Sequence, residues 1–369
     1  MSSGPPRALV TVDCSAVEAN VRTLAGASRS AVWAVVKADG YGHGALPVAR
    51  AALVAGAIGL GVATVDEAHA LRDALPGARI LLLSPVPEGR EWELSGLEVA
   101  VSTPEGWDRL RAGGATNVGC HVEVETGMGR WGLDPALALA VGRELAAGGV
   151  LGLRLAGLMS HLATADDPAD PHTERQLEAF RAVALTFSAC PRHLANSAGA
   201  LLHPGTRFDE VRCGIAIYGI APDDTDAARF GLRPALSMSS GIAAVRDLGP
   251  GESSGYGRRL VADRPLRVAL VPVGYADGYP RALSGCADVL VGGGRARVAA
   301  TISMDQLTFV VPDELRATVG VGDEVVLIGA AGSDRIGVEE LARLAGTIGY
   351  EIVCGLRPRP DRIARRVTP

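Results

Sequence analysis

The chain has 369 residues, of which 48% are hydrophobic, and a formal net charge of -5 with a pI of about 5.9. This length exceeds one ordinary core and predicts two domains. The mildly negative charge excludes the electrostatic pattern of a nucleic-acid or anionic-lipid binder. The first seven residues lack the apolar core of a secretory signal, and no apolar run reaches the roughly 20 residues needed to span a bilayer. We therefore expect a cytoplasmic protein.

In the first two-thirds of the chain, short β-branched runs alternate with helical stretches rich in Ala, Leu and Arg. The predicted strands are 32–36, 59–63, 80–83, 99–102, 118–124, 153–158, 193–195 and 209–212. Amphipathic helices are predicted between them, including 66–74, 134–147 and 171–189. Eight β units separated by helices predict an α/β fold, a parallel (β/α)8 barrel of the TIM type.

After about residue 232 the pattern changes to short apolar runs broken by glycine-rich turns. The predicted strands are 268–272, 288–291, 297–302, 308–311 and 324–328, and only 337–345 looks helical. This pattern predicts a mainly β second domain. We place the barrel at 12–232 and the β domain at 233–369, which the N-terminal segment 1–11 is expected to join.

Six cysteines are widely scattered, with neither a CxxC pair nor a metal-ligand spacing. They are Cys14, Cys120, Cys190, Cys213, Cys286 and Cys354. Reduced, mostly buried thiols and no metal site are therefore expected.

The ten residues from Val35 to Gly44 (VVKADGYGHG) carry the strongest chemical signal. Lys37 stands where an apolar run stops, and a loop with three glycines and Tyr41 follows it. An ammonium at the mouth of a buried strand is poorly hydrated, which favours the neutral, nucleophilic amine of a Schiff-base lysine. A lone lysine at a strand end more commonly extends into water. The flanking residues therefore decide between the two interpretations.

Other polar residues fall at the ends of predicted barrel strands, where such barrels build their active sites. Lys37 ends the first strand, Arg130 follows the fifth, His161 the sixth, Asn196 and Ser197 the seventh, and Arg212 to Gly214 the eighth. The position after strands seven and eight commonly binds phosphate. We expect Asn196, Ser197 and the backbone amides of Gly214 and Ile215 to do so. Taken alone, His161 could be a core histidine and Arg212 a surface ion-pair arginine.

The segment from Val35 to Gly44 closely resembles the pyridoxal-phosphate (PLP) signature of the alanine racemases. Four further segments resemble racemase motifs: GESSGYG at 251–257, VGYADG at 273–278, ISMDQ at 302–306 and IGYEI at 348–352. The resemblance extends from about Val12 to Pro369. It implies an isomerase of fold type III with pyridoxal 5'-phosphate as its cofactor.

The resemblance also implies roles for single residues. Lys37 would carry the cofactor, and Tyr41 and Tyr350 would reach its phosphate. His161 would stack on its ring, while Arg212, supported by His193, would donate to the pyridine nitrogen. The residues implied to line the substrate path and hold the substrate carboxylate are Arg130, Tyr275, Met304 and Asp305.

Inverting a stereocentre requires an acid/base group on each face of the α-carbon. The resemblance assigns Lys37 to the proton of the D-enantiomer and Tyr256 to that of the L-enantiomer, with Tyr256 supplied by the partner subunit. It thus implies a homodimer with shared active sites and a small amino acid as substrate, with no nucleic-acid or membrane partner.

Several positions depart from the family pattern, among them position 123. Glu123 stands where the family often has a lysine modified to a carbamate. A carboxylate at this position can hold the Arg130 guanidinium bidentately without that modification.

The activity implied by the resemblance is the interconversion of L- and D-alanine, which supplies D-alanine for peptidoglycan in the cell wall. A serine or broad-specificity racemase is the nearest alternative. Basic amino-acid decarboxylases share the architecture, but their second-domain cysteine motif has no counterpart where Ser303-Met304-Asp305 stands. A PLP-binding protein without racemase activity is less favoured, because the second domain with Tyr256 is retained.

Overall fold

The structure is a computed structural model that describes residues 7–187, 190–356 and 362–369. The chain divides into two compact units. We call Val17–Asp223 with Ala228–Arg233 the barrel unit, and Met1–Ala16 with Asp224–Ala227 and Pro234–Pro369 the β unit.

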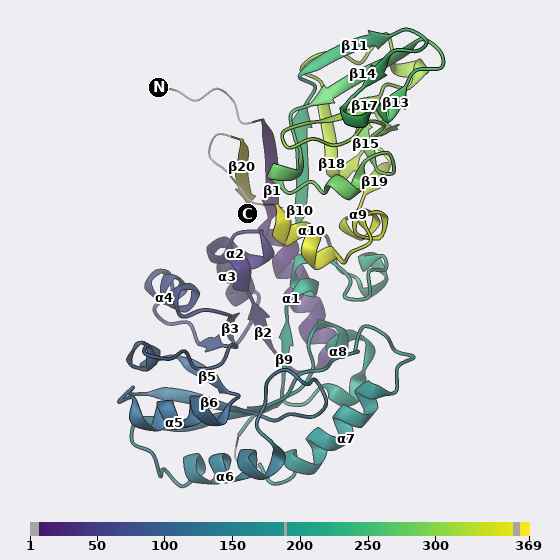
Figure 1. Ribbon diagram of the computed structural model, residues 1–369. Coiled ribbons are helices and arrows are strands. Elements are labelled where there is room, and N and C mark those ends of the chain that lie inside the picture. Colours follow the sequence, from purple (N-terminus) through teal and green to yellow (C-terminus); the bar gives the residue numbers. More distant parts are fainter. Residues whose placement is uncertain (1–6, 188–189, 357–361) are drawn as a thin grey trace. The chain divides into compact units, whose positions relative to one another are not determined.

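The barrel unit contains eight parallel strands (Figure 1). They are β2 (Ala31–Val35), β3 (Gly59–Val62), β4 (Ile80–Leu82), β5 (Glu98–Val101), β6 (Val118–Glu123), β7 (Leu153–Met159), β8 (Arg192–His193) and β9 (Glu210–Cys213). Neighbours pair in the order β8-β7-β6-β5-β4-β3-β2-β9. The N–H of Asp209 donates to Arg192 O (3.0 Å) and that of Arg212 to Ala195 O (2.9 Å), so the sheet nearly closes on itself. The predicted (β/α)8 barrel is confirmed.

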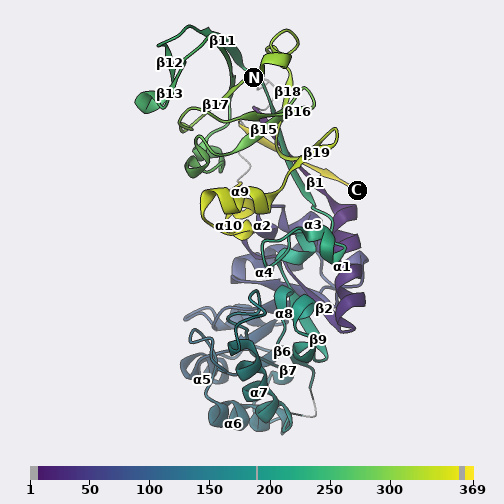
Figure 2. The ribbon, with the colours of Figure 1, turned by 90° about the vertical axis from the view of Figure 1, so that its right-hand side faces the viewer.

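One helix precedes the first of these strands, and helices follow most of the strands. They are α1 (Cys14–Ser28), α2 (Lys37–Tyr41), α3 (Ala45–Val54), α4 (Val65–Ala74), α5 (Pro104–Ala112), α6 (Pro135–Ala146), α7 (His172–Ala184) and α8 (Ser197–Leu202). Figures 1 and 2 show α4 to α7 around the outside of the barrel strands. The side chains of Thr64, Thr103 and Asp134 cap the N-termini of α4, α5 and α6 by accepting backbone N–H groups. The helix predicted for 171–189 ends at Ala184, and residues 188–189 lie outside the described part.

The β unit is built on a seven-stranded sheet. Its strands are β1 (Ala8–Asp13), β10 (Leu236–Gly241), β15 (Asp288–Val291), β16 (Gly294–Arg297), β18 (Glu324–Ala331), β19 (Asp334–Ile336) and β20 (Ile363–Thr368). The first strand of the chain, β1, lies antiparallel to β10 and parallel to β20. A second sheet contains β11 (Ala244–Leu248), β14 (Leu266–Val271) and β17 (Leu307–Val310), beside a hairpin of β12 (Ser253–Ser254) and β13 (Leu260–Val261). The unit is mainly β, as predicted.

Two predictions for the β unit are wrong, one about a strand and one about the number of helices. The strand predicted for 297–302 ends at its first residue, because β16 stops at Arg297 and only Val298 forms a bridge, to Phe309. The backbone beyond it leaves the sheet, and Thr301 bonds to a neighbouring loop. The unit also contains two helices rather than one, α9 (Val338–Ala345) and α10 (Gly349–Gly355). Terminal glycines and β-branched residues give α10 a weak helical signal in the sequence.

The expectation of mostly buried cysteines is also wrong. Only Cys120 and Cys213, both on barrel strands, are buried, and the other four are half-buried. Burial of the two interior thiols raises the pKa of each to about 12, so both stay protonated at neutral pH.

Among the described residues, the helices are all too short or too polar to cross a membrane.

Candidate active site

Lys37 lies directly after β2, in an unusual backbone turn. In α2 the residues Ala38, Asp39, Gly40 and Tyr41 all have φ between 51° and 62°, so this short element is left-handed. Three of the four carry side chains, for which the left-handed conformation costs roughly 1–2 kcal/mol per residue. Such strain persists only where the surroundings enforce it, and it is typical of functional sites. The loop predicted from the glycines is therefore an ordered, strained turn.

Hydrogen bonds from neighbouring elements hold this turn. The Glu67 carboxylate accepts the Ala38 N–H at Oε1 (2.7 Å) and the Ala63 N–H at Oε2 (2.8 Å). The Asp39 carboxylate accepts the Ala45 N–H (2.9 Å) at the start of α3. The Lys37 side chain itself is half-buried. The turn thus fixes the lysine at the carboxyl end of the first barrel strand.

Lys37 is the only lysine in the chain, although lysine and arginine together number 36. Arginine cannot form a Schiff base or lose its proton at neutral pH, whereas lysine can do both. A single lysine, retained at the strand end of a strained turn, is the strongest signal of chemistry in the composition.

The Tyr41 hydroxyl reaches the position where β9 ends. A Cβ added to Gly214 would lie 2.5 Å from this hydroxyl, so only glycine leaves room for it. The Ser197 Oγ accepts the N–H groups of Gly214 (3.0 Å) and Ala216 (3.3 Å). Asn196 caps α8 through its side-chain oxygen, which accepts the Gly199 N–H (2.9 Å). Hydroxyl groups and backbone amides thus gather where the sequence predicts a phosphate site, and Ile215 begins the 3₁₀ helix η3 (Ile215–Tyr218) beside them.

Arg212 points into the barrel interior and is only 4% exposed. Its guanidinium donates to the Ser160 carbonyl (2.5 Å), to the carbonyl and Nδ1 of His193 (2.8 Å each) and to Nδ1 of His161 (3.3 Å). Burial lowers the pKa of Arg212 to about 10, which still leaves it protonated at neutral pH. The surface ion pair considered as the alternative is therefore excluded.

His161 follows β7 beside three cationic side chains. Burial, and then the charges of Arg212, Arg130 and Lys37, lower the pKa of His161 to about 3. The imidazole is therefore neutral at physiological pH. Gln176, which is fully buried on α7, donates to the His161 carbonyl (2.8 Å) and accepts the Ala163 N–H (2.8 Å). No sequence pattern singles out this glutamine.

The predicted bidentate pair between Glu123 and Arg130 is not formed. Glu123 is 4% exposed at the end of β6, and its Oε2 has no hydrogen-bond partner among the residues that the structure describes, whereas Arg130 is exposed. The intervening turn is held instead by Glu125, whose carboxylate accepts the N–H groups of Gly127 and Gly129. Burial raises the pKa of Glu123 to about 7 although Arg212 and Arg130 oppose the shift.

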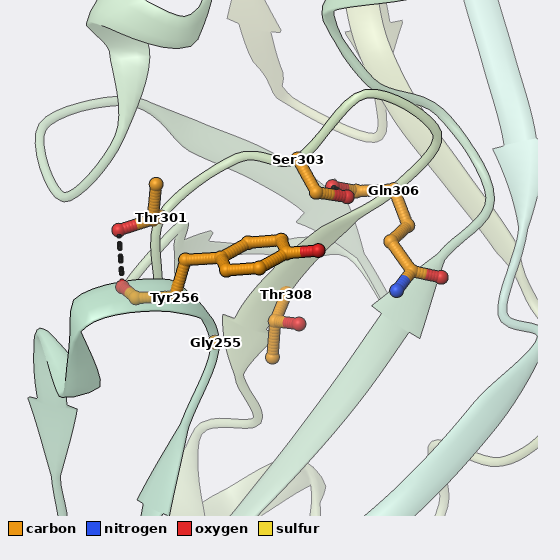
Figure 3. Close-up of a pocket in the computed structure, with 6 residues that line it drawn as sticks. All are labelled: Gly255, Tyr256, Thr301, Ser303, Gln306 and Thr308. Carbon is orange, nitrogen blue, oxygen red and sulfur yellow. Dashed lines mark hydrogen bonds between the residues drawn. The ribbon is translucent and has the colours of Figure 1, made fainter.

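In the β unit, Tyr256 begins the 3₁₀ helix η5 (Tyr256–Arg258) and is 74% exposed. The Thr301 hydroxyl donates to its carbonyl (2.8 Å) and fixes the backbone. Figure 3 shows the Tyr256 ring reaching across a pocket of about 340 Å³, lined by Gly255, Tyr256, Thr301, Ser303, Gln306 and Thr308. The exposed phenol is available to a group outside this unit.

Two further predicted residues lie on a loop next to this pocket. The N–H of Tyr275 donates to Ser303 O (3.1 Å) and that of Ala276 to Met304 O (3.0 Å), and a Cβ on Gly274 would overlap the Ser303 carbonyl. These backbone contacts hold the loop of Tyr275 against the loop of Met304. The side chains of both residues stay exposed, at 42% and 53%.

Asp305 and Tyr350 also belong to the β unit. The Asp305 carboxylate accepts a hydrogen bond from Arg362 (2.6 Å), which ties the loop of Asp305 to the residue that precedes β20. Tyr350 is the second residue of α10 and is half-buried. Direct contact of either residue with substrate or cofactor stays a prediction.

These features define a class of protein: a barrel enzyme with a lysine at a strand end and a second, mainly β domain that presents an exposed tyrosine. The model of the alanine racemase N-terminal domain matches residues 12–222, and that of the C-terminal domain matches residues 235–364. The chain belongs to the alanine racemase family, whose members are PLP-dependent racemases.

Individual relatives agree over nearly the full length. The chain is 45% identical to an alanine racemase of Symbiobacterium thermophilum over 364 residues, 95% of each chain. The crystal structure of alanine racemase from Streptomyces lavendulae superposes with a TM-score of 0.91 at 38% identity, covering 99% of this chain and 98% of that one. The alanine racemase of Bartonella henselae, with covalently bound pyridoxal phosphate, superposes with a TM-score of 0.87 at 30% identity over 99% of this chain and 100% of that one.

Proposed function

We propose that this protein interconverts L- and D-alanine with pyridoxal 5'-phosphate, as a cytoplasmic homodimer that supplies D-alanine for peptidoglycan. The observation that carries the proposal is the sole lysine of the chain, fixed on a strained turn at a barrel strand end. It stands within a family match that covers both units. A serine or broad-specificity racemase remains the alternative.

The residues of the barrel unit fit the cofactor. Lys37 would hold it covalently, and the Tyr41 and Ser197 hydroxyls, which lie beside the Gly214 turn, would be donors suited to a phosphate. His161 and Arg212 would meet its ring. When bound, PLP withdraws electrons from the substrate α-carbon and so makes the α-proton acidic.

The two groups expected at the ring have fixed protonation states. Arg212 stays protonated and has no proton to release at neutral pH, so it can donate a hydrogen bond but not protonate the ring nitrogen. His161 stays neutral because its pKa is far below physiological pH. Neither group therefore competes with Lys37 and Tyr256 as a proton carrier. A ring nitrogen that is not protonated would make the cofactor a weaker electron acceptor, which would favour reprotonation of the α-carbon over side reactions.

Racemisation then needs one proton carrier on each face of the α-carbon. Lys37, once released by the substrate amine, would move the proton of the D-enantiomer. Tyr256 would move that of the L-enantiomer. Arg130 would attract the substrate carboxylate, with Met304 and Tyr275 lining its path. Because Tyr256 is exposed on its own β unit, we propose that it serves the barrel of a second copy.

The proposal is tested by a chiral assay on purified, PLP-loaded protein with alanine, serine and a panel of other amino acids. Racemisation of alanine in preference to the others supports it, and preference for serine selects the alternative. Borohydride reduction should attach the cofactor to the peptide containing Lys37, and Lys37→Arg should abolish this label. Labelling of the N-terminal amine alone, or no racemisation of any amino acid, would overturn the proposal.

A further inference from the structure

A row of buried polar side chains crosses the barrel interior behind Arg212. Glu98 at the start of β5 contacts His121 on β6 (Oε2 to Nε2, 2.6 Å). His121 contacts His193 on β8 (Nδ1 to Nε2, 2.7 Å), and His193 contacts Arg212 on β9 (Nδ1 to Nη1, 2.8 Å). We call these four residues the barrel network. It extends from the amino-terminal end of the barrel to the candidate active site.

The direction of every hydrogen bond in the barrel network follows from its two ends. A guanidinium can only donate, so His193 accepts at Nδ1 and carries its proton on Nε2. That proton is donated to His121 Nδ1, which leaves the His121 proton on Nε2, facing Glu98. An ionised carboxylate can only accept. Both histidines are thus fixed as neutral Nε2–H tautomers between a cation and an anion.

The anionic end is held firmly. Arg79 forms a bidentate pair with Glu98 (2.8 and 3.0 Å) and also lies over the Trp33 ring. Burial alone would raise the pKa of Glu98, but the hydrogen bonds from His121 and Arg79 outweigh it and lower the pKa to about 2. Glu98 is therefore ionised at physiological pH, as the directed row requires.

The barrel backbone makes room for these side chains. A bulge between β6 and β7 sets Gly157 opposite His121, and a Cβ on Gly157 would overlap His121 Nδ1. A Cβ on Gly119 would lie 2.9 Å from Glu98 Cγ. All four network residues are at most 4% exposed. Replacing buried polar groups by packed apolar ones often leaves stability equal or higher. Stability alone does not account for this arrangement.

We propose that Glu98 and His121 are positioning residues, which fix the tautomer of His193 and thereby aim the Arg212 guanidinium at the ring of the cofactor. The inference rests on the proposed function, since Arg212 is placed there as the partner of the ring nitrogen. His193 was predicted to support Arg212. The extension to His121 and Glu98 makes that support depend on a charge at the opposite end of the barrel.

The test compares two variants of similar size at one position. In His121→Asn, the amide oxygen can still accept from His193 Nε2, although the contact with Glu98 is broken. In His121→Leu, no acceptor remains. We expect kcat for alanine to fall by about tenfold or more in His121→Leu, with KM changed less than about twofold, and His121→Asn to recover a clear part of that loss.

The direct readout is nitrogen NMR of protein with labelled imidazoles, of which the chain has seven. Wild type should show His121 and His193 unprotonated at Nδ1, and His121→Leu should shift the His193 signals. The matched control is Glu210→Gln, a buried carboxylate that bonds Trp33 (2.6 Å) and no histidine. It should leave both tautomers unchanged.

A proton on Nδ1 of His193 in wild type would overturn the proposal. So would His121→Leu with unchanged His193 signals, or equal kcat for the leucine and asparagine variants. Asparagine is less favourable than leucine in a buried core. A folding defect would therefore make His121→Asn the less active variant, which is the opposite of the expected order. The NMR measurement does not depend on turnover, so it determines the tautomers even in a protein that racemises no amino acid. The absence of racemisation in the wild type would refute the proposed function and not the tautomer assignment.

Discussion

At the scale of single residues, burial and neighbouring charges give three groups around the candidate site one protonation state each at neutral pH. Arg212 and the Glu98 carboxylate stay charged, and His161 stays neutral. Glu123 differs, because burial raises its pKa to about 7 and its Oε2 has no hydrogen-bond partner in the described part of the chain.

Glu123→Gln should therefore stabilise the protein in a pH-dependent manner. Burial raises the pKa of Glu123 in the folded state above the 4.5 of an ordinary glutamate. Both the folded and the unfolded state bind the carboxyl proton below pH 4.5, and the folded state loses stability relative to the unfolded state as the pH rises from 4.5 through 7. The gain from glutamine should be near zero at pH 4.5 and reach up to about 3 kcal/mol above pH 7.5. Denaturant unfolding at pH 5 and pH 8 measures it.

The control for this prediction is Glu18→Gln, which removes a surface pair with Arg22 (2.7 Å). Such pairs contribute little, so the control should show a small difference at both pH values. A Glu123→Gln difference that does not grow with pH would contradict a raised pKa.

Tyr256→Phe tests the assignment of faces at the same scale. Removing the phenol should abolish α-deuterium exchange from L-alanine far more than from D-alanine, because only one of the two abstraction steps loses its base. Exchange is followed by NMR for each enantiomer separately. Equal losses from both enantiomers would refute separate carriers for the two faces.

At the scale of elements, the turn that carries Lys37 depends on the start of α4. One carboxylate, Glu67, accepts N–H groups of Ala38, Ala63 and Thr64 while Thr64 caps Glu67 in return. Glu67→Ala should lower stability by about 1–3 kcal/mol and lower activity further than the stability loss explains, because the strained turn loses its support.

Thr103→Ala provides the comparison for Glu67→Ala, since Thr103 caps α5, an element that does not contact the lysine turn by any described hydrogen bond. Its stability loss should be similar and its kcat close to wild type. Hydrogen exchange at the Ala38 amide should rise only in Glu67→Ala. If both variants lose activity equally, the turn does not depend on Glu67.

The same scale shows what the sequence could predict. Alternating β-branched and helical runs predicted all eight barrel strands, most of which are largely apolar because parallel strands are buried on both faces. The polar β8 (Arg192–His193) overlaps the strand predicted for 193–195 at one residue only. The left-handed conformation of four successive residues from Ala38 had no signal, since alanine disfavours it and aspartate adopts it mostly as a single residue. Local patterns likewise missed β1 and β20, which pair with each other across the length of the sequence.

Within the candidate site, Lys37 and Arg212 were predicted as polar residues at strand ends, and Tyr41 was predicted from the family resemblance. Gln176, Glu98 and His121 were missed, because a polar residue inside a helix or strand carries no sign of which other element it will meet. Their partners lie 15 to 72 residues away. Only the folded barrel brings them together.

At the scale of the whole molecule, the two proposed proton carriers belong to different units. Lys37 lies in the barrel unit and Tyr256 in the β unit. Two-fold symmetry lets one interface create two equivalent sites, each with the lysine of one subunit and the tyrosine of the other. We therefore expect the active species to be a dimer, with no complete site in a monomer.

Mixing Lys37→Ala subunits with Tyr256→Phe subunits, each nearly inactive alone, should then restore activity. A mixed dimer has one site with both carriers and one with neither. With random exchange about half of the dimers are mixed, so activity should reach roughly a quarter of the wild-type value. A racemase assay follows it, with exchange verified by mass spectrometry. The control mixes each variant with itself. If every site were built within one subunit, no mixture would contain an intact site. Verified exchange without recovery would therefore contradict shared active sites.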